Sequence, residues 1–138
     1  MDILHIEDNR AEAHLVARIL DKEGITTSYH LINNGEAALA FFFQAHPFPD
    51  MWPKLILLDI KLPKINGLDV LTRLKADERT RTIPVIILSA SAQERDVALA
   101  YKLGVNSYLV KPVKYDQFKD LLKTLGKYWL QHNTQIPD

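Results

Sequence analysis

The sequence predicts an α/β fold in which helices cover both faces of a doubly wound parallel sheet, in three layers. Two observations predict it. Short apolar runs alternate five times with stretches whose apolar residues recur at helical spacing. The central run, residues 55–58, is apolar at every position, which is typical of a parallel strand that helices cover on both faces. At 138 residues, the common solution is a flavodoxin-like (βα)5 fold with strand order 2-1-3-4-5.

Each element has its own local signal. Residues 3–6 form a first apolar run, residues 26–32 a more polar one that suits a sheet edge, and residues 55–60 the central one. Two further strands are predicted at residues 83–88 and 106–110.

Helices are predicted between the strands and after the last one. Gly24 and Gly104 stop the first and fourth helices, since glycine favours helix ends. Three prolines exclude regular structure from residues 45–54 and predict a long surface loop. The predicted helices cover residues 10–23, 36–44, 67–75, 93–103 and 114–130.

Composition narrows the class of protein. Seventeen basic residues balance seventeen acidic ones, so nothing favours binding to nucleic acid. The chain has no cysteine, which excludes disulfides and thiolate chemistry and fits a cytoplasmic location. No signal peptide is apparent, and no apolar run approaches the roughly 18 residues of a membrane span. We expect one domain over residues 1–138, with no output domain, no membrane and no nucleic-acid partner.

Polar side chains follow four strands that the predicted order makes neighbours. The first strand is followed by Glu7 and Asp8, the third by Asp59, the fourth by Ser89 and the fifth by Lys111. Because parallel strands end at one edge of a sheet, these side chains are expected to meet there. Each has a simpler explanation alone, such as a helix cap for Asp8, but together these would be a coincidence at four strand ends.

Three carboxylates in one place repel one another, and a divalent cation relieves that repulsion. Magnesium takes a few carboxylates and completes its shell with water and phosphate oxygens. A carboxylate such as Asp59 can act as a nucleophile and form an aspartyl-phosphate. The Lys111 ammonium and the Ser89 hydroxyl are suited to the oxygens of the transferring group. The pattern therefore predicts phosphoryl transfer to Asp59.

The chain resembles the receiver domains of two-component response regulators over nearly its whole length. The matching segments are residues 6–9, 57–59, 87–90 and 108–112, with Pro63 and Gly67. The resemblance implies that Asp59 takes a phosphoryl group from a sensor histidine kinase. The acidic pair is Glu-Asp instead of the commoner Asp-Asp, a variation that the family tolerates, and lysine is a less usual residue at position 61.

The resemblance also implies roles for particular residues. Glu7, Asp8, Asp59 and the backbone carbonyl of Lys61 would hold Mg²⁺, and the peptide bond before Pro112 would be cis. Two further residues would carry the switch, with Ser89 moving towards the phosphate and the aromatic Tyr108 rotating into the vacated space. A half-buried strand tyrosine is the simpler interpretation of Tyr108.

The proline-rich loop and residues 128–131 make the chain most similar to stand-alone regulators paired with phytochrome-type, light-sensing histidine kinases. Its output would then be contact with an unknown downstream protein. The surface of the fourth helix, fifth strand and fifth helix is the expected seam of a homodimer, with an ordinary solvated face as the alternative.

Other functions stay open. The chain could be an ordinary single-domain receiver or a phosphorelay intermediate unrelated to light, or a receiver that acts by binding alone. A flavodoxin-like electron carrier would need a phosphate-binding loop where Glu7 and Asp8 stand. An aspartyl-phosphate phosphatase usually has a second acid where Lys61 stands.

Overall fold

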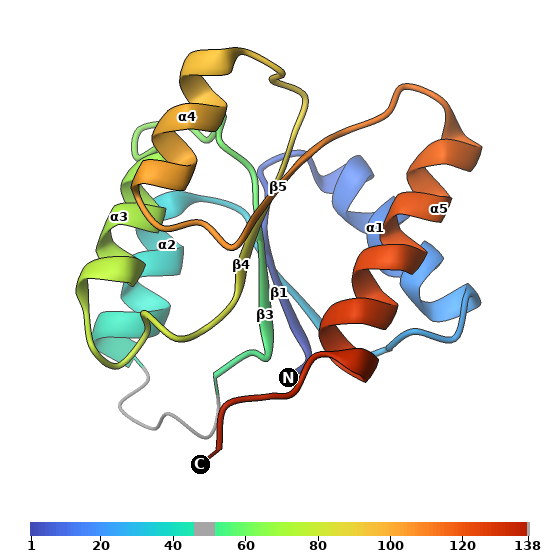
Figure 1. Cartoon of the computed structure of the whole chain (residues 1–138), viewed down its shortest axis with the longest axis horizontal. Coiled ribbons are helices and arrows are strands. Elements are labelled where there is room, and N and C mark those ends of the chain that lie inside the picture. The colour runs from blue at the N-terminus through green and yellow to red at the C-terminus, as the bar shows by residue number, and fades with distance from the viewer. Residues whose placement is uncertain (46–51, 138) are drawn as a thin grey trace.

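In the computed structural model, which describes residues 1–45 and 52–137, five parallel strands form one sheet in the order β2-β1-β3-β4-β5. This is the predicted flavodoxin-like order. Figure 1 shows the sheet edge-on, with α1 and α5 on one face and α2, α3 and α4 on the other. The strands are β1 (Ile3–Ile6), β2 (Tyr29–Ile32), β3 (Leu55–Leu58), β4 (Val85–Ser89) and β5 (Ser107–Val110).

The helices also follow the predicted sequence of elements. Two of them continue into π-helical turns, η1 (Phe41–Ala45) after α2 and η3 (Lys127–His132) after α5. No described helix is long and apolar enough to cross a membrane. The α-helices are α1 (Arg10–Lys22), α2 (Gly35–Ala40), α3 (Gly67–Ala76), α4 (Glu94–Lys102) and α5 (Tyr115–Gly126).

Among the strands, the observed bounds differ most from the predicted ones at β2, which begins at Tyr29 instead of residue 26. The Thr26 hydroxyl donates to the Asp2 carboxylate (2.6 Å) and accepts from the Ser28 amide (2.9 Å). These side-chain bonds turn the chain before it can join the ladder, as threonine often does in loops. Most of the predicted loop, residues 46–51, lies outside the described residues.

The strands divide their apolar side chains between two cores because successive side chains point to opposite faces. On β3, Ile56 and Leu58 pack under α2, α3 and α4, while Leu55 and Leu57 pack under α1 and α5. All four are fully buried. Each buried side chain contributes about 1.5–3 kcal/mol relative to an exposed one, so β3 anchors both cores.

Lys75 of α3 lies at the end of the sheet where β4 and β5 begin, opposite the predicted site. Its ammonium donates to the carbonyls of Arg81 (2.9 Å) and Ile83 (3.1 Å) and to the Asn106 side chain (3.0 Å). The same Asn106 oxygen accepts from the Val85 amide at 2.9 Å, where β4 begins. This lysine therefore ties α3 to the starts of β4 and β5.

At Gly67, the loop after β3 packs closely against the backbone of residues 59–60. The Gly67 amide donates to the Ile60 carbonyl at 2.8 Å, and a Cβ at this position would lie 2.0 Å from the Asp59 carbonyl oxygen. Only glycine permits this approach, which fixes the backbone beneath the Asp59 side chain.

We predict that Gly67→Ala lowers the free energy of unfolding by about 2–4 kcal/mol, because the added methyl must displace backbone. Gly24→Ala is the matched control. Gly24 has a φ of +69° but open space around its Cβ position, so it should lose only about 1 kcal/mol through left-handed strain. Urea denaturation measures both. Equal losses would contradict the close approach at Gly67.

Candidate functional site

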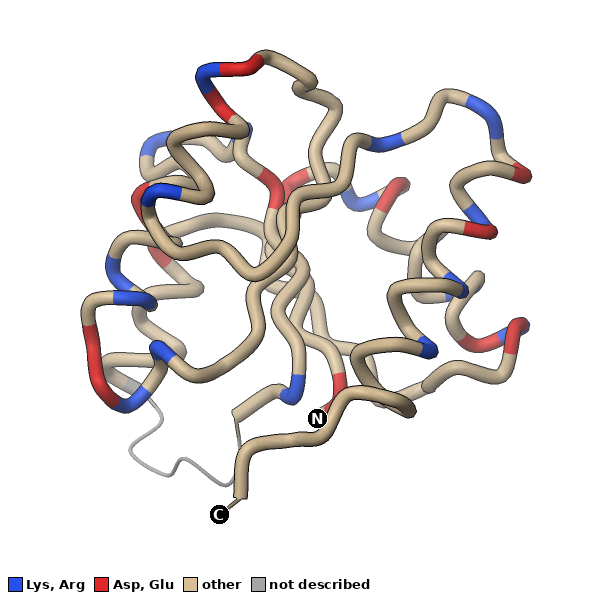
Figure 2. Tube along the Cα trace, in the orientation of Figure 1, with Lys and Arg blue, Asp and Glu red and all other residues tan. Residues whose placement is uncertain are grey.

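Two acidic residues leave the sheet side by side. In the parallel pairing of β1 with β3, Ile6 lies opposite Leu58. The residues that follow, Glu7 and Asp59, are therefore neighbours, and the Asp59 amide donates to the Ile6 carbonyl at 3.1 Å. Both residues are buried, with exposed fractions of 1% and 8%. Figure 2 shows acidic residues gathered at this end of the sheet.

Lys111 brings the opposite charge from the end of β5. Its backbone amide donates to the Ser89 carbonyl at 2.8 Å, which joins the ends of β4 and β5. Its ammonium donates to Glu7 at 2.8 Å and lies 3.4 Å from Asp59. The predicted meeting of Glu7, Asp59 and Lys111 is confirmed by these distances.

Sequence reasoning missed Glu12, the third carboxylate at the site. It lies in the first turn of α1 and accepts from the Lys111 ammonium at 2.5 Å. One carboxylate oxygen from each of Glu7, Glu12 and Asp59 lies within 4.8 Å of the others. The sequence did contain a signal for Glu12, because it is an acidic residue in the first turn of the helix that follows the first strand, near the predicted site.

Asp8, expected beside Glu7, is exposed. The group of acidic ligand atoms found among the described residues does not include it. Alternation along the chain explains this, since Asp8 leaves β1 in a different direction from Glu7. The role of Asp8 as a metal ligand therefore stays a prediction.

The peptide bond between Lys111 and Pro112 was expected to be cis, and this expectation is wrong. The described residues contain no cis peptide bond. The trans form is the lower in energy for most bonds before proline. The Lys111 side chain reaches Glu7 and Glu12 from the trans backbone.

The charges at the site perturb one another. Burial, with hydrogen bonds to Glu12 and Asp59, raises the pKa of Glu7 to about 9, although Lys111 opposes this. Burial alone would lower the pKa of Lys111, but its hydrogen bonds to Glu12 and Glu7 raise it. One ammonium thus faces more negative charge than it can neutralise.

These residues fit a divalent metal ion. The donors are carboxylate oxygens, which are the ligands of hard cations. Burial is the main cause of the raised pKa of Glu7, because it disfavours the ionised carboxylate, and a bound cation would favour that ionised form. Lys61, whose carbonyl is a predicted ligand, donates its amide to Asp59 at 3.4 Å.

Ser89 ends β4 and is fully buried, two residues beyond Ile87, which pairs with Leu58. Its hydroxyl accepts from the Ser91 amide at 3.2 Å. The Tyr108 hydroxyl donates to the Ser91 carbonyl at 2.8 Å, and the Ser91 hydroxyl donates to Asp96 in the first turn of α4 at 2.5 Å. Hydrogen bonds therefore connect Ser89 to both Tyr108 and α4.

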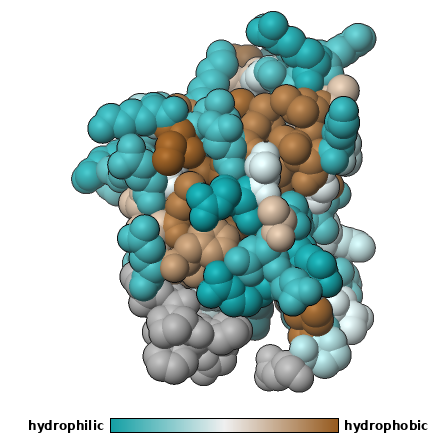
Figure 3. Space-filling model, turned by 90° about the vertical axis from the view of Figure 1, so that its left-hand side faces the viewer, coloured by the Kyte–Doolittle hydropathy of each residue, from teal (hydrophilic) through white to brown (hydrophobic). Residues whose placement is uncertain are grey.

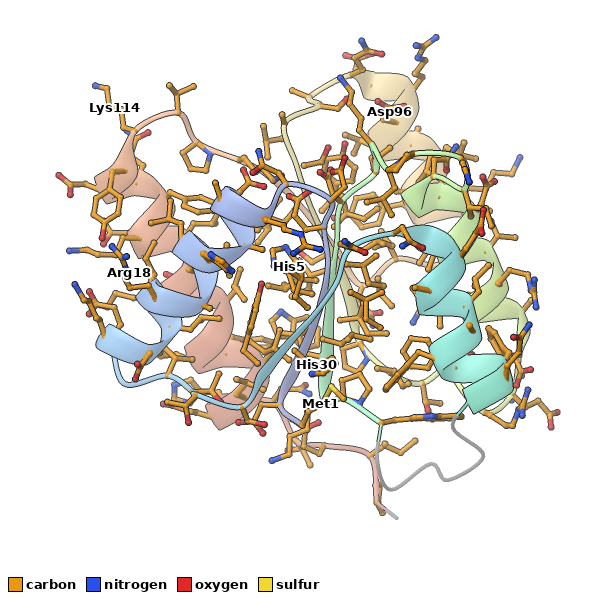
Figure 4. The ribbon with its side chains drawn as sticks, turned by 180° about the vertical axis from the view of Figure 1, so that it is seen from behind. Met1, His5, Arg18, His30, Asp96 and Lys114 are labelled. Atoms are coloured by element: carbon orange, nitrogen blue, oxygen red, sulfur yellow. The ribbon has the colours of Figure 1, made fainter. Side chains whose placement is uncertain are left out.

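His5, two residues before Glu7, is buried next to the site. His5 belongs to β1, and its side chain lies between β1 and α1 (Figure 4). Its Nδ1 is 2.6 Å from the Tyr29 hydroxyl, which donates to the Ala13 carbonyl of α1 at 3.2 Å. Burial, together with the nearby Lys111 ammonium, lowers the pKa of His5 to about 3. His5 therefore adds no charge beneath Glu7.

Comparison with known proteins agrees with this geometry. The family model for the response regulator receiver domain matches residues 3–123. The probable methanogenesis regulatory protein FilR2 of Methanothrix harundinacea is 37% identical over 131 residues, covering 95% of this chain and 84% of that protein. Response regulator Rcp1 of Synechocystis is 35% identical over 130 residues, covering 94% and 88%.

Solved structures give the same result. The phosphorylated cyanobacterial phytochrome response regulator RcpA superposes with a TM-score of 0.89 at 32% identity, covering 99% of this chain and 98% of that one. The Mn²⁺-bound form of Rcp1 superposes with a TM-score of 0.84 at 34% identity, covering 98% of both chains.

We predict that millimolar Mg²⁺ or Mn²⁺ raises the free energy of unfolding by about 1 kcal/mol or more, because a ligand that binds only the folded state stabilises it. Glu7→Gln should abolish the increase by removing a buried ligand. Glu23→Gln, which removes a carboxylate at the far end of α1, should keep it. Urea denaturation with and without metal measures this, and an increase that persists in Glu7→Gln would contradict the site.

Proposed function

The chain belongs to the family of response regulator receiver domains, and on that premise we propose that Asp59 accepts a phosphoryl group from a sensor histidine kinase. The observation that carries the proposal is the Lys111 ammonium 3.4 Å from a buried Asp59 carboxylate at the sheet edge. The proposal is supported because a carboxylate can act as the nucleophile and the neighbouring ammonium is suited to a phosphate oxygen.

The transfer is a direct displacement at phosphorus. A bond forms between an Asp59 carboxylate oxygen and phosphorus while the bond from phosphorus to the imidazole nitrogen of the kinase breaks, and the imidazole keeps that electron pair. Lys111 neutralises one equatorial oxygen, and the Ser89 hydroxyl donates to another. The same groups would assist the later attack of water, so the protein would catalyse its own phosphorylation and dephosphorylation.

Glu7, Asp8, Asp59 and the carbonyl of Lys61 would hold a magnesium ion, which supplies positive charge to the phosphate oxygens when bound. The carboxylate cluster supports Glu7 and Asp59 as ligands, and its third member is Glu12. Magnesium is proposed because it is the hard cation that keeps sites open for phosphate oxygens.

Phosphorylation would be converted to a signal through Ser89. A phosphate that draws the Ser89 hydroxyl inward pulls on the Ser91 amide that bonds to it, and Ser91 is bonded to Tyr108 and to α4. Reversing a strongly biased two-state equilibrium needs roughly 5 kcal/mol. Several charge-assisted hydrogen bonds to the phosphate supply energy of that order.

We also propose that the kinase is of the phytochrome type and that the signal passes to a downstream protein. Support comes from the similarity to RcpA, a cyanobacterial phytochrome response regulator, over almost the full length of both chains. A receiver or phosphorelay intermediate unrelated to light is the alternative, and phosphotransfer from a purified phytochrome kinase distinguishes the two.

Acetyl phosphate with Mg²⁺ should label the wild-type protein with an acid-stable, base-labile phosphate, as an acyl phosphate requires. Asp59→Asn should take no label, because its amide is not a nucleophile. Asp69→Asn, which changes a carboxylate in the first turn of α3, is the control and should be labelled like the wild type. Equal labelling of Asp59→Asn would refute the assignment, as would an unlabelled wild type.

The proposed dimer surface, formed by α4, β5 and α5, carries several exposed hydrophobic side chains. Figure 3 shows the adjoining side of the molecule, over α2, α3 and α4, where hydrophobic side chains also reach the surface between hydrophilic ones. Large exposed hydrophobic residues continue from α4 through β5 to the start of α5, and they comprise Leu99, Tyr101, Val110, Val113 and Tyr115.

We predict that the phosphorylated protein dimerises through this surface and that Tyr101→Glu prevents it by placing charge in the seam. The matched control is Tyr128→Glu, because Tyr128 lies in η3 and is 51% exposed against 52% for Tyr101. Analytical ultracentrifugation before and after phosphorylation measures the change. A phosphorylated wild type that sediments as a monomer would count against the dimer.

A further inference from the structure

The Lys111 ammonium lies at different distances from its three carboxylate partners. An ammonium has three N–H donors, and three carboxylates surround this one. Its nitrogen lies 2.5 Å from Glu12, 2.8 Å from Glu7 and 3.4 Å from Asp59. The proposed phosphoacceptor is therefore the weakest of the three partners, and the helix residue is the nearest.

Glu12 is also placed apart from the other two carboxylates. Glu7 and Asp59 leave neighbouring strands, whereas Glu12 approaches from α1 and is more exposed, with a side chain 25% exposed against 1% and 11%. Glu12 and Lys111 both line a groove of about 360 Å³ between the starts of α1 and α5. The bond to Glu12 thus holds the ammonium on the α1 side of the site.

We propose that Glu12 is a positioning residue that competes with the phosphoryl group for Lys111. The inference rests on the proposed function, since it assumes that Asp59 is phosphorylated. In the unphosphorylated protein, Glu12 retains the ammonium on the α1 side. During transfer, charge develops on the phosphoryl oxygens and the ammonium must serve them. The strength of the Glu12 bond therefore limits how fast Asp59 is phosphorylated.

The Glu12 side chain has no part in capping its helix. The cap of α1 is the Asn9 side chain, which accepts from the backbone amide of Glu12 at 3.1 Å. Substitution of the Glu12 side chain leaves that bond in place, so α1 is expected to keep its first turn. The effect of a substitution can then be assigned to the bond with Lys111.

Glu12→Gln tests the proposal because glutamine keeps the shape of the side chain and removes its charge. The initial rate of Asp59 phosphorylation by acetyl phosphate at saturating Mg²⁺ should rise about two- to fivefold, which is the size expected from losing one partly exposed ion pair. Glu12→Asp keeps the charge and should return the rate towards that of the wild type.

The matched control is Glu23→Gln. Glu23 is on the same helix, its side chain is also 25% exposed, and it pairs with Lys119 and Lys123 of α5 at 3.8 and 3.7 Å. Removing it changes the net charge equally but leaves Lys111 untouched, so the rate should stay as in the wild type.

A crystal structure of Glu12→Gln provides a readout besides rate. The Lys111 nitrogen should move from 3.4 Å to about 2.8 Å from Asp59, the usual length of a charge-assisted bond. An unchanged or lower rate in Glu12→Gln would overturn the proposal, and a lower rate would indicate a metal ligand. An equal rise in Glu23→Gln would also overturn it. If these occur while the wild type is labelled at Asp59, the proposed function stands without the role of Glu12.

Discussion

The candidate site depends on the Lys111 ammonium, which contacts three carboxylates at once. Lys111 contacts Glu7, Glu12 and Asp59, which come from three different elements. Such a cluster is costly to bury unless a cation compensates it, and one lysine compensates it only in part. The remaining negative charge makes the edge of the sheet receptive to a metal ion and, through that ion, to a phosphate.

Parallel strands explain why these groups meet. Register places Glu7 beside Asp59, and the Lys111 amide bonds to the end of β4. The strand ends are positioned by cores on both faces of the sheet, in which β3 is fully buried. The site is thus built on the buried part of the fold, while the Ser91 hydroxyl connects it to the more exposed α4 by a hydrogen bond to Asp96.

Much of this arrangement was predictable from the sequence, and the failures have physical causes. Asp59 and Lys111 were predictable because residues at parallel strand ends share one edge. Glu12 was not, because its place depends on how α1 packs and on the reach of its side chain. The geometry of the bond before Pro112 was inferred from resemblance alone, and the structure has it trans. Thr26 shortened β2 through side-chain bonds that a pattern of apolar residues does not register.

The contacts of Lys75 have a mechanical consequence for the sheet. They fasten α3 to the beginnings of β4 and β5, at the edge remote from Asp59. β4 is also paired with β3 and β5 along its length, so the strand is held from its start to Ser89, whereas the loop beyond Ser89 has no such ladder. Events at the Ser89 end of β4 would therefore reach the surface as a tilt of the loop and helix that follow, with little movement near Asn106.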